Sequence, residues 1–251
     1  MRIGVFVGSA PFLEYLDQVQ PVTMDDAGVD ADVDADKWGQ PSDQVFALQG
    51  SAHTLFFMRR HGADHEYAPH KINYRANFWR MYSHQIDGVI GCYTVRGIDP
   101  NFAVGDFVFA DQIIDYTWGR AHTFDDELRH VEFSYPYNAS LKEILLSHGK
   151  KVGITTHDSG VYGCTQGPRL ETAAEIRKFA KDGCSMIGMT GMPEASLCRE
   201  LGLPMVSISV VVNPAAGLND KPIDMASLHK VNQRGARDLA HLLQEFANQT
   251  D

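Results

Sequence analysis

The stretch MVSISVVVNPAAGL, residues 205–218, decides the fold of this chain. Its first eight residues form an almost continuously apolar run, which is typical of a strand covered on both faces of a sheet. The run ends at an amide side chain, Asn213, followed by Pro214. Asparagine is unfavourable in strands, and a buried amide without a partner costs about 1–3 kcal/mol. Asn213 is therefore a candidate ligand-binding residue, and the alternative is an amide that caps the turn before Pro214.

Short apolar runs of this kind recur along the chain and alternate with amphipathic stretches. The apolar runs cover residues 3–7, 44–48, 53–58, 88–95, 106–110, 160–165, 185–190 and 205–212. The amphipathic stretches cover residues 70–85, 138–149, 171–183, 192–202 and 225–249, and glycines predict helix ends at Gly149, Gly183 and Gly202. This alternation predicts one α/β domain over residues 1–251, with a mostly parallel or mixed sheet.

Composition and charge narrow the classes of partner. The chain has 251 residues, 44% of them hydrophobic, and a net charge of −10. An acidic surface argues against nucleic acid and anionic membranes as partners, but it allows a small anion in a locally basic pocket. No apolar run approaches the roughly 20 residues of a membrane helix. The acidic segment 25–36 lacks the spacing of a calcium-binding EF-hand loop and is expected to be a surface loop.

Cysteine usage bears on the compartment. The four cysteines are scattered and form no CxxC pair: Cys92, Cys164, Cys184 and Cys198. This pattern favours reduced, mostly buried thiols and a cytoplasmic protein. The amino-terminal apolar run is too short for a secretion signal.

Anion-binding residue types follow three of the predicted strands. Ser9 follows the first strand, Arg60 and His61 follow the run 53–58, and Thr190 ends the run 185–190. Backbone N–H groups at such turns, hydroxyls and guanidinium forks all suit phosphate. Each also has an ordinary explanation, namely a strand-ending turn or a surface basic patch. Together they fit a ligand placed beyond the carboxyl ends of the strands.

Glu171 stands in GCTQGPRLETAAE (163–175), where a turn at Gly167-Pro168 precedes a predicted helix. An acidic residue in a first helical turn complements the helix dipole, which is the simpler explanation. The functional alternative is a carboxylate that accepts a hydrogen bond from a heterocycle N–H. The sequence has no HExxH, no Walker A motif and no GxGxxG, so it suggests neither a zinc site of that kind nor a nucleoside triphosphate or dinucleotide.

Five long stretches resemble the trimeric purine nucleoside phosphorylases, most closely the branch of S-methyl-5′-thioinosine phosphorylases. They read GVYGCTQGPRLETAAEI, IGMTGMPEASLCRELGLP, VVVNPAAG, RRHG…HKINYRANFW and DQIIDYTWGRAHTF. The resemblance implies a central mixed sheet flanked by helices and a homotrimer. It also implies phosphorolysis, in which a nucleoside and inorganic phosphate give a free purine and a sugar 1-phosphate, with no other cofactor and no metal.

The resemblance also assigns roles to residues. For phosphate they are Ser9, Arg60, His61, Thr94 and Thr190. For the nucleoside they are Met189 at the ribose, Glu171 and Asn213 at the purine, His130 reaching across a subunit interface to the 5′ end, and Met225 and Leu228 in an apolar 5′ pocket. Asn213, Glu171 and His61 would carry the catalysis.

The purine-facing pair predicts a preference among bases. An amide at Asn213 can donate to N7 and to a 6-oxo group, and Glu171 can accept from an N1–H that only a 6-oxopurine has. Mismatched buried polar groups reject an analogue strongly. We therefore predict hypoxanthine over adenine, and an apolar Met225/Leu228 pocket favours a methylthio group over a 5′-hydroxyl.

Two segments depart from the family pattern. The turn after the first strand reads Val7-Gly8-Ser9-Ala10 where the family has GGTG, and Tyr93 and Arg96 replace a small polar residue and a glycine. Arg96 either adds an anion contact or blocks backbone N–H groups, and Tyr93 is a candidate to fill the sugar pocket. Three hypotheses follow: a 6-oxopurine methylthionucleoside phosphorylase, a phosphorylase of inosine and guanosine or of methylthioadenosine, and a purine nucleoside-binding protein without turnover.

Overall fold

The computed structural model describes residues 1–8, 12–22, 37–124, 130–219 and 225–249. Within these ranges eleven strands form one mixed sheet. The strands are β1 (Arg2–Val7), β2 (Gln20–Val22), β3 (Val45–Gln49), β4 (Thr54–Arg59), β5 (Gly88–Gly97), β6 (Phe107–Phe109), β7 (Gln112–Asp115), β8 (Thr156–His157), β9 (Val161–Cys164), β10 (Met186–Gly188) and β11 (Met205–Pro214). The main path runs β2-β3-β4-β1-β5-β10-β9-β7, and β11 pairs with both β5 and β6. The expected α/β class with a central mixed sheet is confirmed.

Strands β5 and β11 form the middle of the sheet. They run parallel over their full lengths, and a register shift between Val211 and Asn213 brings Asn213 beside Arg96. Nearly every residue of both strands is buried, which agrees with the apolar character of the run 205–212. The pairing therefore places Asn213, predicted to face the purine, next to Arg96, which departs from the family pattern.

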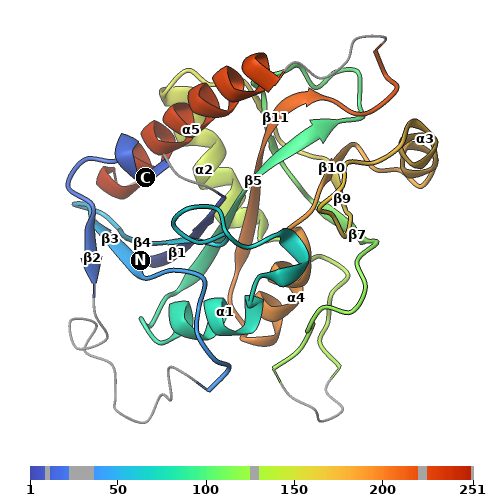
Figure 1. The fold of residues 1–251 in the computed structure, drawn as a ribbon. Helices are drawn as coiled ribbons and strands as arrows, with labels where there is room; N and C mark the ends of the chain where they lie inside the picture. Colours follow the sequence, from blue (N-terminus) through green and yellow to red (C-terminus); the bar gives the residue numbers. More distant parts are fainter. Residues whose placement is uncertain (9–11, 23–36, 125–129, 220–224, 250–251) are drawn as a thin grey trace.

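Helices cover both faces of the sheet (Figure 1). One face carries α1 (Tyr74–Tyr82) and α4 (Gly191–Glu200), and the other carries α2 (Ala139–Lys151) and α5 (Met225–Asn248). The core is correspondingly divided into one apolar cluster with α1 and α4 and a second with α2 and α5. Helix α3 (Ala173–Lys181) packs on a small cluster of its own beside β10. No helix in the described residues is long and apolar enough to cross a membrane.

Helix α5 lies very close to β11 at one point. A Cβ atom added at Gly235 would come within 2.8 Å of Val210 Cγ1, so the contact depends on the missing side chain. The next turns of α5 bury Leu239, Leu243 and Phe246 against the sheet. The expected apolar face of the last helix is therefore present.

Helix boundaries differ from the sequence-based expectation at three places. Gly149 does not end its helix, because α2 continues to Lys151 and the positive φ of 76° belongs to Gly153. The stretch 70–85 begins with a 3₁₀ turn, Pro69–Lys71, and α1 starts only after Asn73, whose side chain accepts from the Ala76 N–H at 3.2 Å. Glu171 precedes the N-cap Thr172, so the acidic residue of the first turn is Glu175.

Candidate active site

The strand ends named above meet at one cavity of about 440 Å³, here called the central cavity. Its lining includes Gly8, Arg60, His61, Thr94, Arg96, Met189 and Thr190. These residues follow β1, β4 and β10 or stand near the end of β5. Parallel β1, β4 and β5 present their carboxyl ends on the same side, which is why segments far apart in sequence converge. Four of the predicted phosphate ligands lie within the described residues, and all four line this cavity: Arg60, His61, Thr94 and Thr190.

Arg60 is 1% exposed and almost fully occupied by protein partners. Its Nε donates to Glu194 Oε1 at 2.6 Å and its Nη2 to Glu194 Oε2 at 3.2 Å. Nη1 and Nη2 also donate to the carbonyls of Cys92 and Phe6, both at 2.8 Å. Burial opposes the charged form, but the Glu194 carboxylate outweighs it, so the pKa of Arg60 is raised. A guanidinium has five N–H donors, and these bonds leave one Nη1–H for an anion.

Tyr93 is part of the same buried network. Its hydroxyl donates to Glu194 Oε2 at 2.7 Å, and its ring lies 4.8 Å from the Arg60 guanidinium carbon. The ring also packs edge-on against Tyr162, with centroids 5.3 Å apart. Only 4% of Tyr93 is exposed, so the side chain lies in the core with its edge at the cavity wall. The sequence contained no direct signal for the role of Glu194.

His61 is a neutral imidazole at the edge of the cavity. Its pKa is lowered to about 4, mainly by burial and also by neighbouring Arg60 and His65, while a hydrogen bond to the Tyr67 carbonyl acts in the opposite direction. Its Nδ1 lies 2.7 Å from Tyr67 O, which makes Nδ1 the protonated nitrogen because a carbonyl only accepts. Nε2 is then a hydrogen-bond acceptor at neutral pH. It can accept from a protonated phosphate oxygen or a ribose hydroxyl.

Met189 and Thr190 lie between β10 and α4. Thr190 is the N-cap of α4, yet its side chain makes no capping bond, so the hydroxyl remains available to a ligand. The backbone of Met192 is non-helical, with φ of −117° and ψ of 139°, so the regular turns of α4 begin only after this residue. Thr94, on β5, is exposed toward the cavity. Arg120, for which sequence reasoning gave no role, donates to the carbonyls of Met189 and Gln166, both at 2.9 Å, and so ties the two site loops together.

Arg96, which lines the central cavity, forms an ion pair with Glu171, which lines a separate cavity of about 440 Å³ together with Thr165 and Gln166. Arg96 Nη2 donates to Glu171 Oε2 at 2.7 Å, and the Thr165 hydroxyl donates to Glu171 Oε1 at 2.6 Å. The side chains are 14% and 4% exposed respectively. Arg96 therefore neither lies free beside the phosphate ligands nor extends into solvent. It holds the predicted purine-binding carboxylate.

Asn213 is half-buried and directs its amide nitrogen to the carbonyl of the next residue, Pro214, at 2.7 Å. That bond is of the local kind expected of an amide that caps a turn. The backbone nevertheless places Asn213 beside Arg96 on the neighbouring strand. Its assigned purine-reading role stays a prediction.

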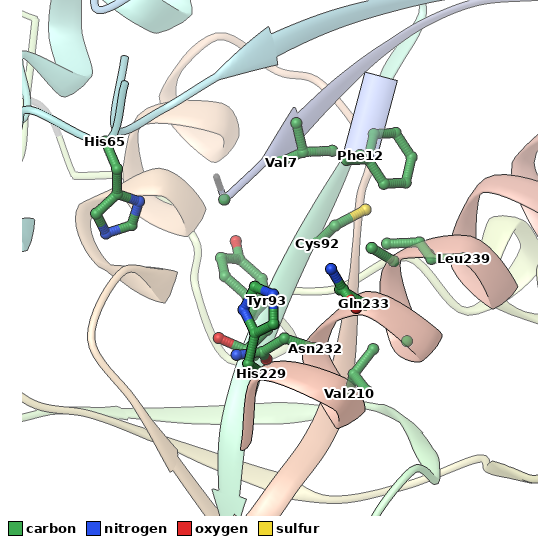
Figure 2. Close-up of a pocket in the computed structure, with 14 residues that line it drawn as sticks. Val7, Phe12, His65, Cys92, Tyr93, Val210, His229, Asn232, Gln233 and Leu239 are labelled. Atoms are coloured by element: carbon green, nitrogen blue, oxygen red, sulfur yellow. The ribbon is translucent and has the colours of Figure 1, made fainter. Parts of the chain in front are cut away.

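A second cavity of about 510 Å³, here called the helix cavity, lies against α5 (Figure 2). It shares four lining residues, Gly8, His65, Tyr93 and Thr94, with the central cavity, so the two are adjoining spaces. His229, Asn232 and Gln233 come from α5, and Val7 and Cys92 lie across from them (Figure 2). Leu228 is not part of this lining and packs against the apolar cluster beneath α5.

Three predicted site residues receive little or no further definition. His130 is exposed in the single chain. Met225 begins α5, but its side chain is not described. Ser9 and the acidic segment 25–36 lie outside the described residues.

All four cysteines are free and buried, and burial raises the pKa of Cys92 and of Cys164 to about 12.

Comparison with known proteins gives a consistent family. The profile of the phosphorylase superfamily matches residues 37–248. A probable S-methyl-5′-thioinosine phosphorylase of Xanthomonas campestris is 39% identical over 253 residues, covering 98% of this chain and 97% of that protein. A similarly named protein of Pseudomonas syringae pv. tomato is 42% identical over 202 residues, covering 79% of this chain and 82% of that protein. A 6-oxopurine nucleoside phosphorylase of Pyrococcus furiosus is 38% identical, covering 74% of each chain.

Solved structures share the fold. A methylthioadenosine phosphorylase from an antarctic soil metagenomic library superposes with a TM-score of 0.85 at 24% identity, covering 97% of this chain and 84% of that one. The methylthioadenosine phosphorylase of Schistosoma mansoni, solved with adenine, superposes with a TM-score of 0.84 at 22% identity, covering 98% of this chain and 91% of that one. At these identities the likeness concerns the arrangement of the chain alone.

Proposed function

Because the chain belongs to the phosphorylase superfamily, we propose that it catalyses phosphorolysis of a 6-oxopurine nucleoside and so acts as a pentosyltransferase. The proposal is supported by the convergence of Arg60, His61, Met189 and Thr190 on one cavity, whose lining residue Arg96 is paired with Glu171. The curated relatives are named for 6-oxopurine nucleosides with and without a 5′-methylthio group. The first substrate hypothesis from the sequence analysis is S-methyl-5′-thioinosine, which would give hypoxanthine and 5-methylthioribose 1-phosphate.

Phosphate would occupy the part of the central cavity next to α4. The Thr190 hydroxyl, His61 Nε2 and the remaining Arg60 N–H would bind it, and the support is that all three residues line this cavity. In the reaction a phosphate oxygen forms the new bond to C1′ while the bond from C1′ to N9 of the purine breaks. The electron pair of that bond leaves with the purine, which takes up a proton. Inorganic phosphate is the co-substrate, and we expect no further cofactor.

Rate enhancement would come from charge placement and orientation. The transition state of such a glycosyl transfer is oxocarbenium-like, with positive charge on the ribose and negative charge entering the purine. A phosphate anion held beneath C1′ stabilises the first charge, and donors around the purine stabilise the second. Fixing both reactants in one cavity removes much of the entropic cost of their encounter.

If the 5′ end of the nucleoside occupies the helix cavity, the polar lining of that cavity favours a second substrate, which carries a 5′-hydroxyl. The buried Asn232 carboxamide oxygen lies in this lining and has no hydrogen-bond partner among the described residues. A 5′-hydroxyl can donate to that oxygen, whereas a methylthio group cannot. Inosine and guanosine are therefore candidates beside methylthioinosine. Replacing Asn232 with Leu should shift the ratio of kcat/KM values toward the methylthio substrate if Asn232 binds the hydroxyl.

A homotrimer is part of the proposal because His130 is assigned to the 5′ end of a neighbouring subunit's nucleoside. The exposure of His130 in the single chain supports such a role. Light scattering should give three times the monomer mass, and His130→Ala should raise KM for the nucleoside more than it lowers kcat. A monomer with full activity would contradict this assignment.

We place the protein in the cytoplasm on the basis of its cysteine usage.

The direct test follows purine release by chromatography with and without phosphate. The substrates are inosine, 5′-methylthioinosine, adenosine and 5′-methylthioadenosine. Phosphate-dependent hypoxanthine release, at least tenfold above adenine release, is the expected result. Thr190→Val should raise KM for phosphate, while Arg234→Gln, at an exposed position of α5, should leave it unchanged. Folded protein that binds nucleoside without releasing purine would overturn the enzymatic proposal and favour a binding function.

A further inference from the structure

We propose that Arg96 reads the 6-oxo group of the purine, so that Arg96 and Glu171 together select the edge of a 6-oxopurine. The inference rests on the proposed function, because it places the purine at Glu171. It assigns a specificity role to a residue that stands where the resembling family has glycine. It also makes the ion pair, rather than the Asn213 amide alone, the determinant of base choice.

Protein contacts fix the geometry of the Glu171 carboxylate. Both Glu171 oxygens are held by the protein, one by Arg96 at 2.7 Å and the other by Thr165 at 2.6 Å. The carboxylate side chain is only 4% exposed. Each carboxylate oxygen has two acceptor sites, so one on each oxygen is left for a ligand. Glu171 lines a cavity of about 440 Å³ with Thr165 and Gln166, whereas Arg96 lines the central cavity, so the ion pair stands between the two spaces. A ligand N–H group that reaches the carboxylate meets a pre-oriented acceptor.

Arg96 keeps donors that its bond to Glu171 does not use. One of its Nη2–H groups binds Glu171, whereas Nε is buried without a hydrogen-bond partner among the described residues. An unsatisfied buried donor is unfavourable, and more so when it is charged. Arg96 lines the central cavity, so a ligand acceptor there can approach its guanidinium. The site therefore presents a donor and an acceptor side by side.

The chemical match is with a lactam. A 6-oxopurine carries N1–H, a donor, next to O6, an acceptor, and these complement Glu171 and Arg96 respectively. A 6-aminopurine carries an acceptor at N1 and a donor at the 6-amino group, so both contacts would be between like partners. Such a double mismatch of buried polar groups is the arrangement that discriminates most strongly between analogues.

The position of Asn213 agrees with this assignment. Asn213 and Arg96 are register partners on β11 and β5, so both lie at the same end of the sheet. The Asn213 amide nitrogen is engaged by the Pro214 carbonyl at 2.7 Å, whereas Arg96 reaches Glu171. Arg96 is thus the donor already placed next to the N1 acceptor. Asn213 would be left to serve the N7 side of the base.

The test measures binding of the free bases hypoxanthine and adenine by calorimetry in phosphate buffer. Wild-type protein, Arg96→Gln, Glu171→Gln and the surface control Arg234→Gln are compared, and circular dichroism checks that each is folded. The wild type and Arg234→Gln should bind hypoxanthine at least tenfold more tightly than adenine. In Arg96→Gln and Glu171→Gln that ratio should fall at least tenfold. Arg96→Lys should restore part of it, since it keeps the charge but not the planar fork.

Several outcomes would overturn the inference. An unchanged ratio in Arg96→Gln would do so, and tighter hypoxanthine binding by that variant would show that Arg96 competes with the purine for Glu171. Folded wild-type protein that binds neither base would also overturn it. Because base binding needs no turnover, the result is separable from the proposed function: phosphorolysis with an unchanged ratio rejects only the role of Arg96. If the preference for hypoxanthine over adenine is lost in Arg96→Gln but the wild type shows no phosphorolysis, only the enzymatic proposal is rejected.

Discussion

Two arginine–glutamate pairs lie within the same part of the sheet and differ in their surroundings. In the Arg60–Glu194 pair both side chains are 1% exposed, and carbonyl and hydroxyl groups complete the network. In the Arg96–Glu171 pair the arginine is 14% exposed and keeps an unpartnered donor. Protein groups occupy all but one of the Arg60 donors in the inner pair, whereas the outer pair retains more capacity for a ligand. The inner pair thus contributes mainly to structure and the outer pair to recognition.

The largest expected effect is on stability, from breaking the inner pair. Glu194→Gln keeps the size of the side chain but leaves the Arg60 charge buried without its counter-ion. Loss of one partner of a buried pair costs about 3–5 kcal/mol. Urea unfolding monitored by circular dichroism should show that loss. A decrease below about 1 kcal/mol would mean that water or another anion replaces the carboxylate, and the contrast between the pairs would fail.

Acid should destabilise the fold through two buried histidines, one beside the inner pair. Burial lowers the pKa of His61 and of His84 to about 4, below the ordinary value of 6.5. Because the folded-state pKa is depressed, the unfolded chain binds protons first as the pH falls. Stability is complete well above pH 6.5 and decreases as the pH falls toward 4, by on the order of 2–3 kcal/mol for each histidine.

The measurement is the free energy of unfolding at pH 7.5, 6.0, 5.0 and 4.5. His84→Phe should make the profile shallower, since it removes one of the two groups while preserving the stacking on Phe56. An identical slope in the variant would show that His84 does not contribute.

Tyr93→Phe separates the hydroxyl from the ring within the inner network. The hydroxyl donates to Glu194, and bonds to charged groups contribute about 1.5–3 kcal/mol, so a decrease near 1.5 kcal/mol is expected. Nucleoside KM should stay within about twofold, because the hydroxyl points to the core. A large rise in KM without loss of stability would instead place Tyr93 in contact with the sugar.

The smallest stability effect is expected at the outer pair. Arg96→Gln should cost about 0.5–1 kcal/mol, since the arginine is partly exposed, while its effect on base choice is large. The control Arg234→Gln breaks an exposed i,i+4 pair with Asp238 and should cost less than about 0.5 kcal/mol. If Arg96→Gln is as destabilising as Glu194→Gln, both pairs are structural.

The central strands were predictable from the sequence because their signal is strong and local. The runs at 88–95 and 205–212 are continuously apolar, and the structure places both in the middle of the sheet. The strands β2, β7 and β8 were missed because they have two to four residues and are only partly buried. The predicted helix end at Gly149 was wrong because, in the sequence alone, a glycine inside a helix looks the same as a glycine that ends one. The positive φ of Gly153 marks the true end of the helix.

The sequence predicted only those residues of the candidate site that directly follow a strand. Arg60, His61 and Thr190 each follow an apolar run, so their convergence follows from a parallel arrangement. Their partners do not follow, because Arg60 and Glu194 are 134 residues apart and Arg96 and Glu171 are 75 apart. Those pairings depend on the strand order and on the position of α4. The polar lining contributed by His229, Asn232 and Gln233 depends on the rotation of α5, which the Gly235 contact with Val210 fixes.

The neutralisation of both guanidinium groups at the central cavity has a consequence for encounter kinetics. Arg60 and Arg96 each face a carboxylate, and His61 is uncharged at neutral pH. The chain as a whole carries −10, so a phosphate dianion approaching from solvent meets net repulsion rather than attraction. Dipoles and hydrogen bonds hold it only after arrival. Moderate ionic strength, which screens charges beyond about 10 Å, should therefore accelerate phosphate capture by this protein.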